Sequence, residues 1–216
     1  MELSSLLPPQ LDDTAAPLIP KKSGGLRDLV VLPGFIRVCS KARAPYCKQW
    51  EHDHERSYFA AGSNRAATDV VWRAGIRCEA AQETQQAAAI LWDLASYFQM
   101  IRHRRLLLRA SSTGFPLPIC RLAIRLYRAK RFLKLGCAVA ENGIRPNRGV
   151  APGCNFACTL IKVYCLEGMD AFVENNRDID TDMYIDDLQL ARVGCTEQVV
   201  QRLVEAADEL HFIINA

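Results

Sequence analysis

The chain has 216 residues, half of them apolar and about a quarter charged, so it is long enough to build one large domain or two small ones. No apolar run approaches the length of a membrane span, and the N-terminal segment MELSSLLPPQLDDTAAP lacks the basic start of a secretory signal. The nine cysteines are irregularly spaced, which argues against a disulfide framework and predicts an intracellular protein, cytoplasmic or nuclear and not secreted.

The net charge of +3 hides an uneven distribution along the chain. Residues 102–148 hold twelve Lys and Arg against one acid, and residues 21–77 hold eleven against five. Residues 166–216 hold twelve Asp and Glu against three Arg. Basic stretches beside one acidic cluster suit a protein that holds a polyanion together with divalent cations. Solvated helix faces produce similar charge runs and are the alternative interpretation of each stretch.

The first part of the chain is expected to be irregular. Residues 1–17 are rich in proline, show no clear pattern and are predicted to be loose. Residues 21–33, KKSGGLRDLVVLP, predict a basic turn at Gly24 and Gly25 that leads into a short strand.

The middle and end of the chain alternate between helical and strand patterns. Residues 68–82 predict a helix with Thr68 as its N-cap, and the apolar run 87–93 predicts a central strand. A hairpin is predicted with its turn at residues 141–143, and a last strand at 211–215. Further helices, the first two of them basic, are predicted at 98–111, 117–130, 154–174 and 196–210. This mixture without strict alternation favours an α+β fold.

The segment MYIDDLQLA, residues 183–191, places two adjacent carboxylates between apolar residues. If Asp186 and Asp187 form a two-residue hairpin loop, Ile185 pairs with Leu188 and Met183 pairs with Leu190. These four apolar residues then share one face of the hairpin. Such loops prefer Asn-Gly or Asp-Gly, so Asp-Asp predicts backbone strain, which is more expected at a functional site. A solvated surface turn is the alternative.

The acidic run DIDTDMYIDDLQ, residues 178–189, superficially fits a calcium-binding loop. Its sixth position is Met183 where the loop requires glycine, and its twelfth is Gln189 where the loop requires a bidentate glutamate. Both failures fall on positions that the geometry requires, so we reject a calcium loop.

A better interpretation joins Asp93 to the two hairpin aspartates. Each acidic group ends a short apolar strand, so neighbouring strands would bring the three carboxylates to one end of a sheet. Divalent cations prefer such oxygen ligands, and two bridged ions can stabilise both the attacking and the leaving oxygen of a phosphate. Upstream, PKKSGGLR supplies three residues of the type that binds a triphosphate: Lys21, Lys22 and Arg27.

Four segments occur in an informative order: IPKKSGGLRDLVVLP, LWDLASYF, NRGVAPGCNFACTL and YIDDLQLA. Together they resemble the fingers and palm of reverse transcriptases, most closely those of non-LTR (LINE-type) retroelements, over residues 18–216. The resemblance implies a right-hand polymerase palm, a small antiparallel sheet backed by helices, over residues 87–216. It implies a partial fingers region over 18–86 and a chain that ends before the thumb.

The resemblance also implies roles for individual residues. Asp93, Asp186 and Asp187 would be catalytic and would hold two Mg²⁺ ions, with Mn²⁺ as the alternative ion. Nucleotide-binding residues would be Lys21, Lys22, Arg27, Phe98 as the steric gate against ribose, and Gly153. Contacts to the nucleic acid would come from Arg148, Gly149 and Tyr184. The implied reaction is the attack of a DNA primer 3′-OH on the α-phosphate of a dNTP, directed by an RNA template.

One departure from the family pattern concerns the nucleotide pocket. Where many relatives have Gln-Gly, this chain has Pro152 and Gly153, and so lacks an amide that would touch the nucleotide. Two alternatives therefore remain at this stage. One is an inactive retroelement remnant that only binds nucleic acid through its basic helices. The other is an RNA-dependent RNA polymerase, which Phe98 disfavours because ribonucleotide users need a smaller or polar residue there.

Overall fold

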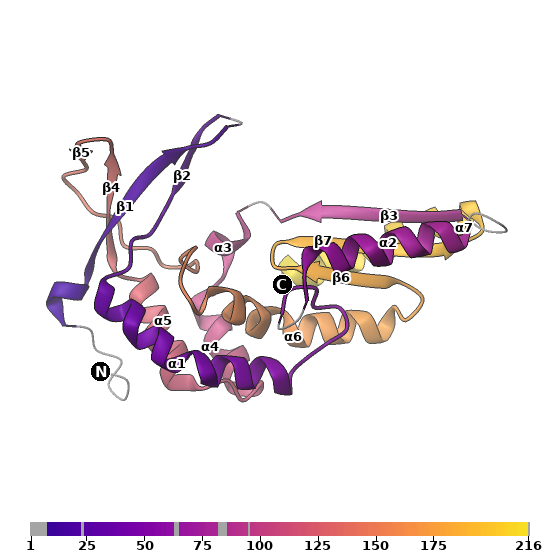
Figure 1. The fold of residues 1–216 in the computed structure, drawn as a ribbon, viewed down its shortest axis with the longest axis horizontal. Coiled ribbons are helices and arrows are strands. Elements are labelled where there is room, and N and C mark those ends of the chain that lie inside the picture. Colours follow the sequence, from indigo (N-terminus) through magenta and orange to yellow (C-terminus); the bar gives the residue numbers. More distant parts are fainter. Residues whose placement is uncertain (1–7, 23, 63–64, 82–85, 95, 216) are drawn as a thin grey trace. The chain divides into compact units, whose positions relative to one another are not determined.

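A computed structural model describes residues 8–22, 24–62, 65–81, 86–94 and 96–215. The chain divides into two compact units, each formed from two separate stretches of sequence (Figure 1). The first unit contains the chain up to Asp53 together with residues 96–164, and the second contains residues 54–95 and 165–216. The predicted division into residues 1–17, 18–86 and 87–216 describes functional regions and stays a prediction.

The first unit combines a four-stranded sheet with helices. Its strand order is β2 (Leu26–Asp28), β1 (Asp13–Pro20), β4 (Lys130–Leu135) and β5 (Ala138–Val139), in which β1 and β4 run parallel. Its helices are η1 (Pro9–Leu11), α1 (Gly34–Asp53), α3 (Tyr97–Met100), α4 (His103–Ser112), α5 (Leu117–Tyr127) and the first part of α6 (Ala157–Asn175). The basic turn and short strand predicted for residues 21–33 are confirmed, as are the helices α5 and α6. The single helix predicted at 98–111 is divided into α3 and α4 by a break at residues 101–102.

Two predictions for the first unit are wrong. Residues 1–17 were expected to be loose, but β1 begins at Asp13, because Thr14 and Ala16 alternate into the interior while β1 pairs with two neighbours. Residues 1–7 lie outside the described chain. The second hairpin turns at residues 136–137 and not at 141–143, since Leu135 pairs with Ala138 and Gly136 supplies a positive φ of 58°.

The second unit is a three-stranded antiparallel sheet packed between helices. The strand order is β3 (Gln86–Asp93), β7 (Asp187–Gly194), β6 (Asp180–Tyr184). Helices α2 (Ala67–Ala81) and α7 (Thr196–Asn215) lie against β3 and β7 on opposite faces of the sheet (Figure 1). The buried side chains of this unit include Phe172, Met183, Leu188, Leu190, Leu203 and Leu210.

Three details of the second unit differ from the sequence predictions. The strand β3 lies at an edge of the sheet and not at its centre. Helix α2 begins at Ala67, which places Thr68 inside its first turn and not at the N-cap. The predicted strand at 211–215 is helical and continues α7, because Ile213 packs closely on Gly168 of α6.

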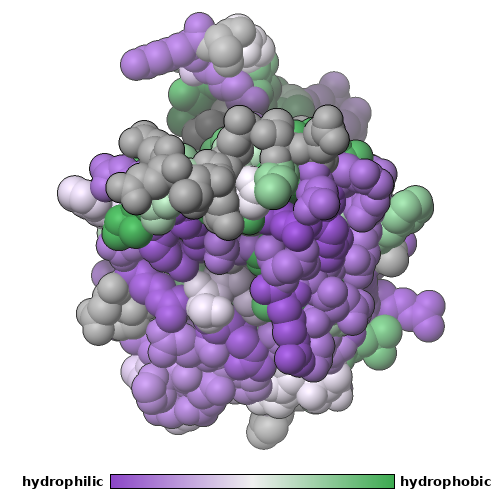
Figure 2. Space-filling model, turned by 90° about the vertical axis from the view of Figure 1, so that its right-hand side faces the viewer, coloured by the Kyte–Doolittle hydropathy of each residue, from purple (hydrophilic) through white to green (hydrophobic). Residues whose placement is uncertain are grey.

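No helix within the described residues is both long enough and apolar enough to cross a membrane. The face drawn in Figure 2 is mostly hydrophilic, with isolated hydrophobic residues between the polar ones.

Candidate active site

The acidic turn connects β6 to β7, and its register differs from the predicted one. Tyr184 pairs with Asp187 and Met183 pairs with Leu188, so the two turn residues are Ile185 and Asp186. The loop is therefore one residue earlier than predicted, so each residue of β6 pairs with a residue two positions earlier in β7 than predicted. Because side chains alternate between the two faces of a strand, this change leaves each side chain on its predicted face. Met183, Leu188 and Leu190 are all buried as expected, whereas Ile185 lies in the turn and is half-buried.

Backbone strain is present at this turn, but it falls on a different residue from the one predicted. Ile185 has a φ of 61°, and only one other non-glycine residue of the described chain, Ser96, has a positive φ. A β-branched side chain rarely adopts this conformation, which costs about 1–3 kcal/mol. The strain of the loop is thus concentrated in Ile185, beside the two aspartates.

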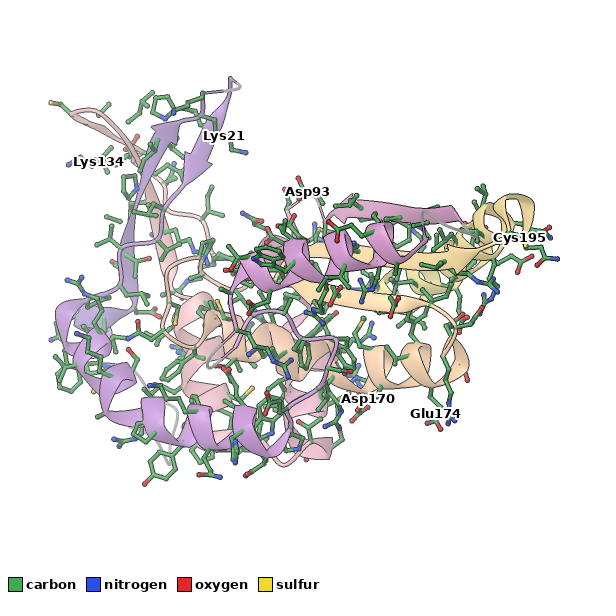
Figure 3. All side chains as sticks on the ribbon, turned by 45° about the vertical axis from the view of Figure 1, so that its right-hand side comes forward. Lys21, Asp93, Lys134, Asp170, Glu174 and Cys195 are labelled. Carbon is green, nitrogen blue, oxygen red and sulfur yellow. The ribbon has the colours of Figure 1, made fainter. Side chains whose placement is uncertain are left out.

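Asp93 and Asp187 lie directly opposite each other across β3 and β7. The next pair contains a hydrogen bond, in which the Leu94 amide donates to the Asp186 carbonyl at 3.0 Å. Hydrogen-bonded and non-hydrogen-bonded pairs alternate in an antiparallel ladder, so Asp93 and Asp187 form a non-hydrogen-bonded pair, whose side chains approach more closely. The predicted placement of Asp93 and the hairpin on neighbouring strands is confirmed for the pair Asp93–Asp187, and Figure 3 shows Asp93 at the end of β3. The predicted convergence of all three carboxylates stays a prediction.

These carboxylates repel one another. The pKa of Asp187 is raised by partial burial and by the charges of Asp186 and Asp93. Among the described residues, no Lys, Arg or His forms an ion pair with Asp93, Asp186 or Asp187.

The neighbouring acids of the same sheet are neutralised by arginines. Asp182 is only 2% exposed and pairs with Arg73 at 2.8 Å and Arg77 at 3.3 Å. Arg77 also pairs with Asp180 at 2.9 Å, so the two arginines of α2 neutralise this part of β6. Asp178 pairs in the same way with Arg202 and Arg192. The acids that would begin a calcium loop therefore have arginine partners, while the turn carboxylates have none among the described residues.

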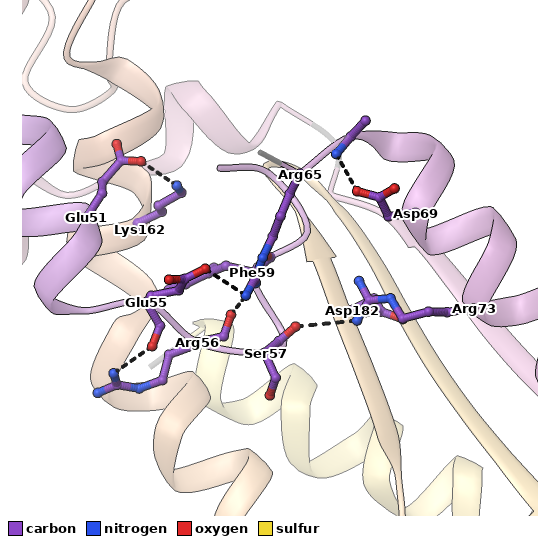
Figure 4. Close-up of polar contacts among 11 residues, drawn as sticks. Glu51, Glu55, Arg56, Ser57, Phe59, Arg65, Asp69, Arg73, Lys162 and Asp182 are labelled. Atoms are coloured by element: carbon purple, nitrogen blue, oxygen red, sulfur yellow. Dashed lines mark hydrogen bonds and ion pairs between the residues drawn. The ribbon is translucent and has the colours of Figure 1, made fainter. Parts of the chain in front are cut away.

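The ion pairs that Arg73 and Arg77 form with these acids are not among the contacts predicted from the sequence. The available signal was their four-residue spacing on a predicted helix, which places both guanidinium groups on one face. Figure 4 shows Arg73 in the polar network above β6, where it also contacts the Ser57 carbonyl. In the same network, Arg65 donates to the carbonyls of Arg56 and Phe59.

The donor chemistry of the turn suits a divalent cation. Carboxylate oxygens are the preferred ligands of Mg²⁺, and uncompensated clustered carboxylates favour its binding. Within the described residues, however, no three His, Cys, Asp or Glu side chains already converge as a metal-binding group. Asp93 and Asp187, which face each other, are the first residues expected to hold the ion, with Asp186 beside them.

The predicted nucleotide-pocket residues of the first unit come together in part. The amide of Val150 donates to the carbonyl of Phe98 at 2.7 Å, and the amide of Gly149 donates to the carbonyl of Ile101 at 2.8 Å. Phe98, in α3, therefore lies against the segment that begins with Arg148. Gly153 has a φ of 84° and open space around its Cα.

The remaining predicted residues lie on hairpins. Lys21 and Lys22 are exposed beside the β1–β2 turn, where the Lys21 amide donates to the Gly25 carbonyl (Figure 3). Arg27 follows in β2, opposite Ile19. Tyr184 ends β6 as the partner of Asp187 and is half-buried. The functional roles of these residues, like those of Arg148, Gly149 and Gly153, stay predictions.

No protein-family model matches the sequence, and no curated protein matches it. Solved structures do match in fold. The chain is similar to a telomerase from Candida tropicalis in complex with a TWJ fragment of telomeric RNA, with a TM-score of 0.68 and 11% identity over 94% of this chain. It is also similar to a Candida albicans telomerase in complex with the same kind of fragment (TM-score 0.64, 9% identity, 93% of this chain).

A third similar structure is an apo telomerase from Candida tropicalis truncated from the C-terminal domain (TM-score 0.58, 11% identity, 93% of this chain). The chain spans less than half the length of these telomerases, covering 47%, 40% and 39% of them. Identities this low bear on the fold alone. The α+β fold of this chain, in which a small antiparallel sheet is backed by helices, is a palm-like fold that it shares with these telomerases.

Proposed function

We propose that the chain is the fingers and palm part of an RNA-directed DNA polymerase from a non-LTR retroelement. The observation that carries this proposal is the pair Asp93–Asp187, which lies beside a strained turn and has no cationic partner among the described residues. Folded proteins seldom leave opposed carboxylates uncompensated unless a cation or a reaction requires them. The fold likeness supports a polymerase, and the order of the four sequence motifs supports the retroelement origin.

In this proposal the three aspartates hold Mg²⁺ and thereby bind the triphosphate of a dNTP next to a primer 3′-OH. When bound, the ions would stabilise the charge that develops on the reacting phosphate. Lys21, Lys22 and Arg27 are proposed to contact the triphosphate, and Phe98 to exclude the ribose 2′-OH. The template is proposed to be RNA, in keeping with the RNA-bound telomerases of similar fold.

The test replaces Asp186 with asparagine, which keeps the side-chain size and removes the charge. We expect Asp186→Asn to abolish Mg²⁺-dependent primer extension, because the variant loses a carboxylate that is proposed to hold the ion. The affinity for an RNA–DNA hybrid should stay within about twofold of the wild-type value, because that affinity depends on cationic side chains that contact phosphates. Asp208→Asn, on the exposed side of α7, is the matched control and should extend primers normally.

The second candidate function is nucleic-acid binding without catalysis, which the arginines of α4 and α5 and Pro152 favour. A wild-type chain that binds hybrids but extends no primer with Mg²⁺ or Mn²⁺ would establish this alternative. We further propose an intracellular location, cytoplasmic or nuclear. The nine cysteines, all of them free, support this proposal.

A further inference from the structure

A short segment of the first unit is held against α3 and α4 by three hydrogen bonds. Two are the backbone bonds from Gly149 to Ile101 and from Val150 to Phe98. The third joins the Nε2 atom of His103 to the Gly149 carbonyl at 2.7 Å. Both polar backbone groups of Gly149 are therefore bonded to the region that contains the proposed steric gate.

Glycine is required at position 149 by two features of this contact. Its φ is 96°, in the region that disfavours side chains, and an added Cβ would lie 3.1 Å from the Cα of Gln99. The Gly149 segment and the residues after Phe98 thus pack backbone against backbone. A small displacement of one must move the other, because no flexible side chain separates them.

His103 is the side chain that completes this arrangement. It is the first residue of α4, is 7% exposed, and has no hydrogen-bond partner for Nδ1 among the described residues. Since a carbonyl can only accept, Nε2 must carry a proton, and in the neutral ring Nδ1 is then the unprotonated nitrogen. A second proton on Nδ1 would leave a buried N–H group unpaired.

The surroundings of His103 also favour its neutral form. Burial lowers the pKa of His103, and the charges of Arg128 and Arg131 lower it further, outweighing the hydrogen bond to Gly149. The ring of Tyr127 lies beside the imidazole, with centroids 6.4 Å apart. A neutral imidazole of fixed tautomer is thus available as a permanent hydrogen-bond donor to the Gly149 carbonyl.

We propose that His103 is a positioning residue that fixes the Gly149 segment against Phe98 and thereby sets discrimination between deoxyribose and ribose. This inference rests on the proposed polymerase function. The Val150 amide donates to the Phe98 carbonyl on one side of the peptide group that joins Gly149 to Val150, and the Gly149 carbonyl on its other side accepts from His103. The hydrogen bond of His103 therefore restrains the segment on which the backbone of Phe98 packs, and with it the position of the proposed gate.

The test compares His103→Leu, which cannot donate, with His103→Gln, whose amide can donate to the same carbonyl. The net contribution of one hydrogen bond to the stability of a conformation corresponds to a factor of about 2 to 13 in its equilibrium constant. We expect His103→Leu to lower the ratio of kcat/KM for dNTPs over rNTPs by about this factor, and His103→Gln to restore most of it. Hybrid binding should not change.

Hydrogen exchange gives a readout that does not depend on catalysis. The amides of Gly149 and Val150 should exchange about 2- to 13-fold faster in His103→Leu than in the wild type, and near the wild-type rate in His103→Gln. Thr113→Val is the control, because it removes another buried side-chain bond of this unit, from Thr113 to the Arg109 carbonyl at 2.7 Å. It should lower the melting temperature without changing sugar selection or these two exchange rates.

The outcomes separate this inference from the proposed function. A wild-type chain that extends no primer would refute the polymerase and with it the selectivity role, whatever the exchange rates are. An active wild type whose sugar discrimination survives His103→Leu would refute only the role of His103. Equal loss of discrimination in Thr113→Val would also refute it, because general destabilisation would then explain the effect.

Discussion

Replacing Asp187 with asparagine should stabilise the metal-free protein and abolish its response to Mg²⁺. Like charges that face each other across two strands cost about 0.2–1 kcal/mol. Asp187 is exposed, so solvent screening reduces this repulsion, and we expect a gain of about 0.5 kcal/mol. For a chain of this length, that corresponds to a rise of about 1–2 °C in melting temperature.

The pH dependence of this gain follows from the raised pKa of Asp187. A carboxyl with a raised pKa in the folded state favours folding below its unfolded value of about 3.9 and loses that contribution as the pH rises through the folded value. The penalty is therefore complete at neutral pH. The difference between Asp187→Asn and the wild type should be largest near pH 7 and should disappear below about pH 4.

Addition of Mg²⁺ should reverse the order of thermal stability of the wild type and Asp187→Asn. A ligand at ten times its Kd stabilises the folded state by about 1.4 kcal/mol, or about 3–6 °C here. The wild type should gain this increment in a thermal melt with MgCl₂, while Asp187→Asn should gain little. The variant is thus expected to be the more stable protein without Mg²⁺ and the less stable protein with it.

Asp178→Asn is the control variant, and its effect on the stability of the metal-free protein should have the opposite sign to that of Asp187→Asn. Burial opposes ionisation of Asp178, but hydrogen bonds and charges from Arg202 and Arg192 hold its pKa below the usual value. Its replacement should lower the melting temperature at neutral pH and keep the full response to Mg²⁺. An equal Mg²⁺ response in Asp187→Asn and wild type, or a metal-free variant no more stable than wild type, would refute the uncompensated-charge argument.

Three further outcomes are expected. If α4 and α5 contact nucleic acid, the affinity of the chain for an RNA–DNA hybrid should fall steeply and log-linearly with salt, and a flat dependence would leave these helices as solvated faces. Phe98→Val should raise ribonucleotide incorporation in primer extension by removing the ring that blocks the 2′-OH, and unchanged sugar selection would contradict the gate. Lys21→Ala with Lys22→Ala should raise the KM for dNTPs without changing the melting temperature, because both side chains are exposed, and an unchanged KM would refute triphosphate contact.

Period and turn signals in the sequence were sufficient to predict the elements that position the site. The apolar run ending in Asp93 forms a strand, and the segment around Asp186 forms a hairpin, as predicted. The predicted central place of the strand and the predicted pairing of Met183 with Leu190 are wrong, because β3 lies at the sheet edge and Met183 pairs with Leu188. The hairpin register could not be determined in this way. A change of two residues in the cross-strand pairing keeps the same side chains on the buried face, so the hydrophobic pattern fits both registers equally well. The observed register places Ile185 in the turn with a positive φ, which the pattern does not predict.

Interactions between distant segments explain the other differences. Ile213 meets Gly168 of another helix, so α7 continues where a strand was expected from the β-rich residues that follow Leu210. The buried Asp182 depends on Arg73 and Arg77, more than a hundred residues earlier, and no local pattern contains that pairing. The contact of His103 is unpredictable for the same reason, since its partner is the distant carbonyl of Gly149.

Strain and charge repulsion coincide at the turn of Ile185 and Asp186, and this coincidence needs a cause. The positive φ of Ile185 costs about 1–3 kcal/mol, and the opposed aspartates cost about 0.2–1 kcal/mol more. The surrounding backbone holds the turn: Met183 exchanges hydrogen bonds with Tyr58 and Ala60 on one side of β6, and Leu94 donates to Asp186 across β3 and β7.

Selection for stability alone would place glycine or asparagine at position 185 and would neutralise the acids, as it does a few residues away along β6. The chain instead keeps a β-branched residue in a strained conformation and leaves the opposed carboxylates of Asp93 and Asp187 without a cationic partner among the described residues. A cation bound by these two residues and Asp186 would offset the repulsion, and the rigid turn would reduce the entropy lost when it binds. The proposed metal-dependent function would therefore account for the strain and the uncompensated charge of this turn together.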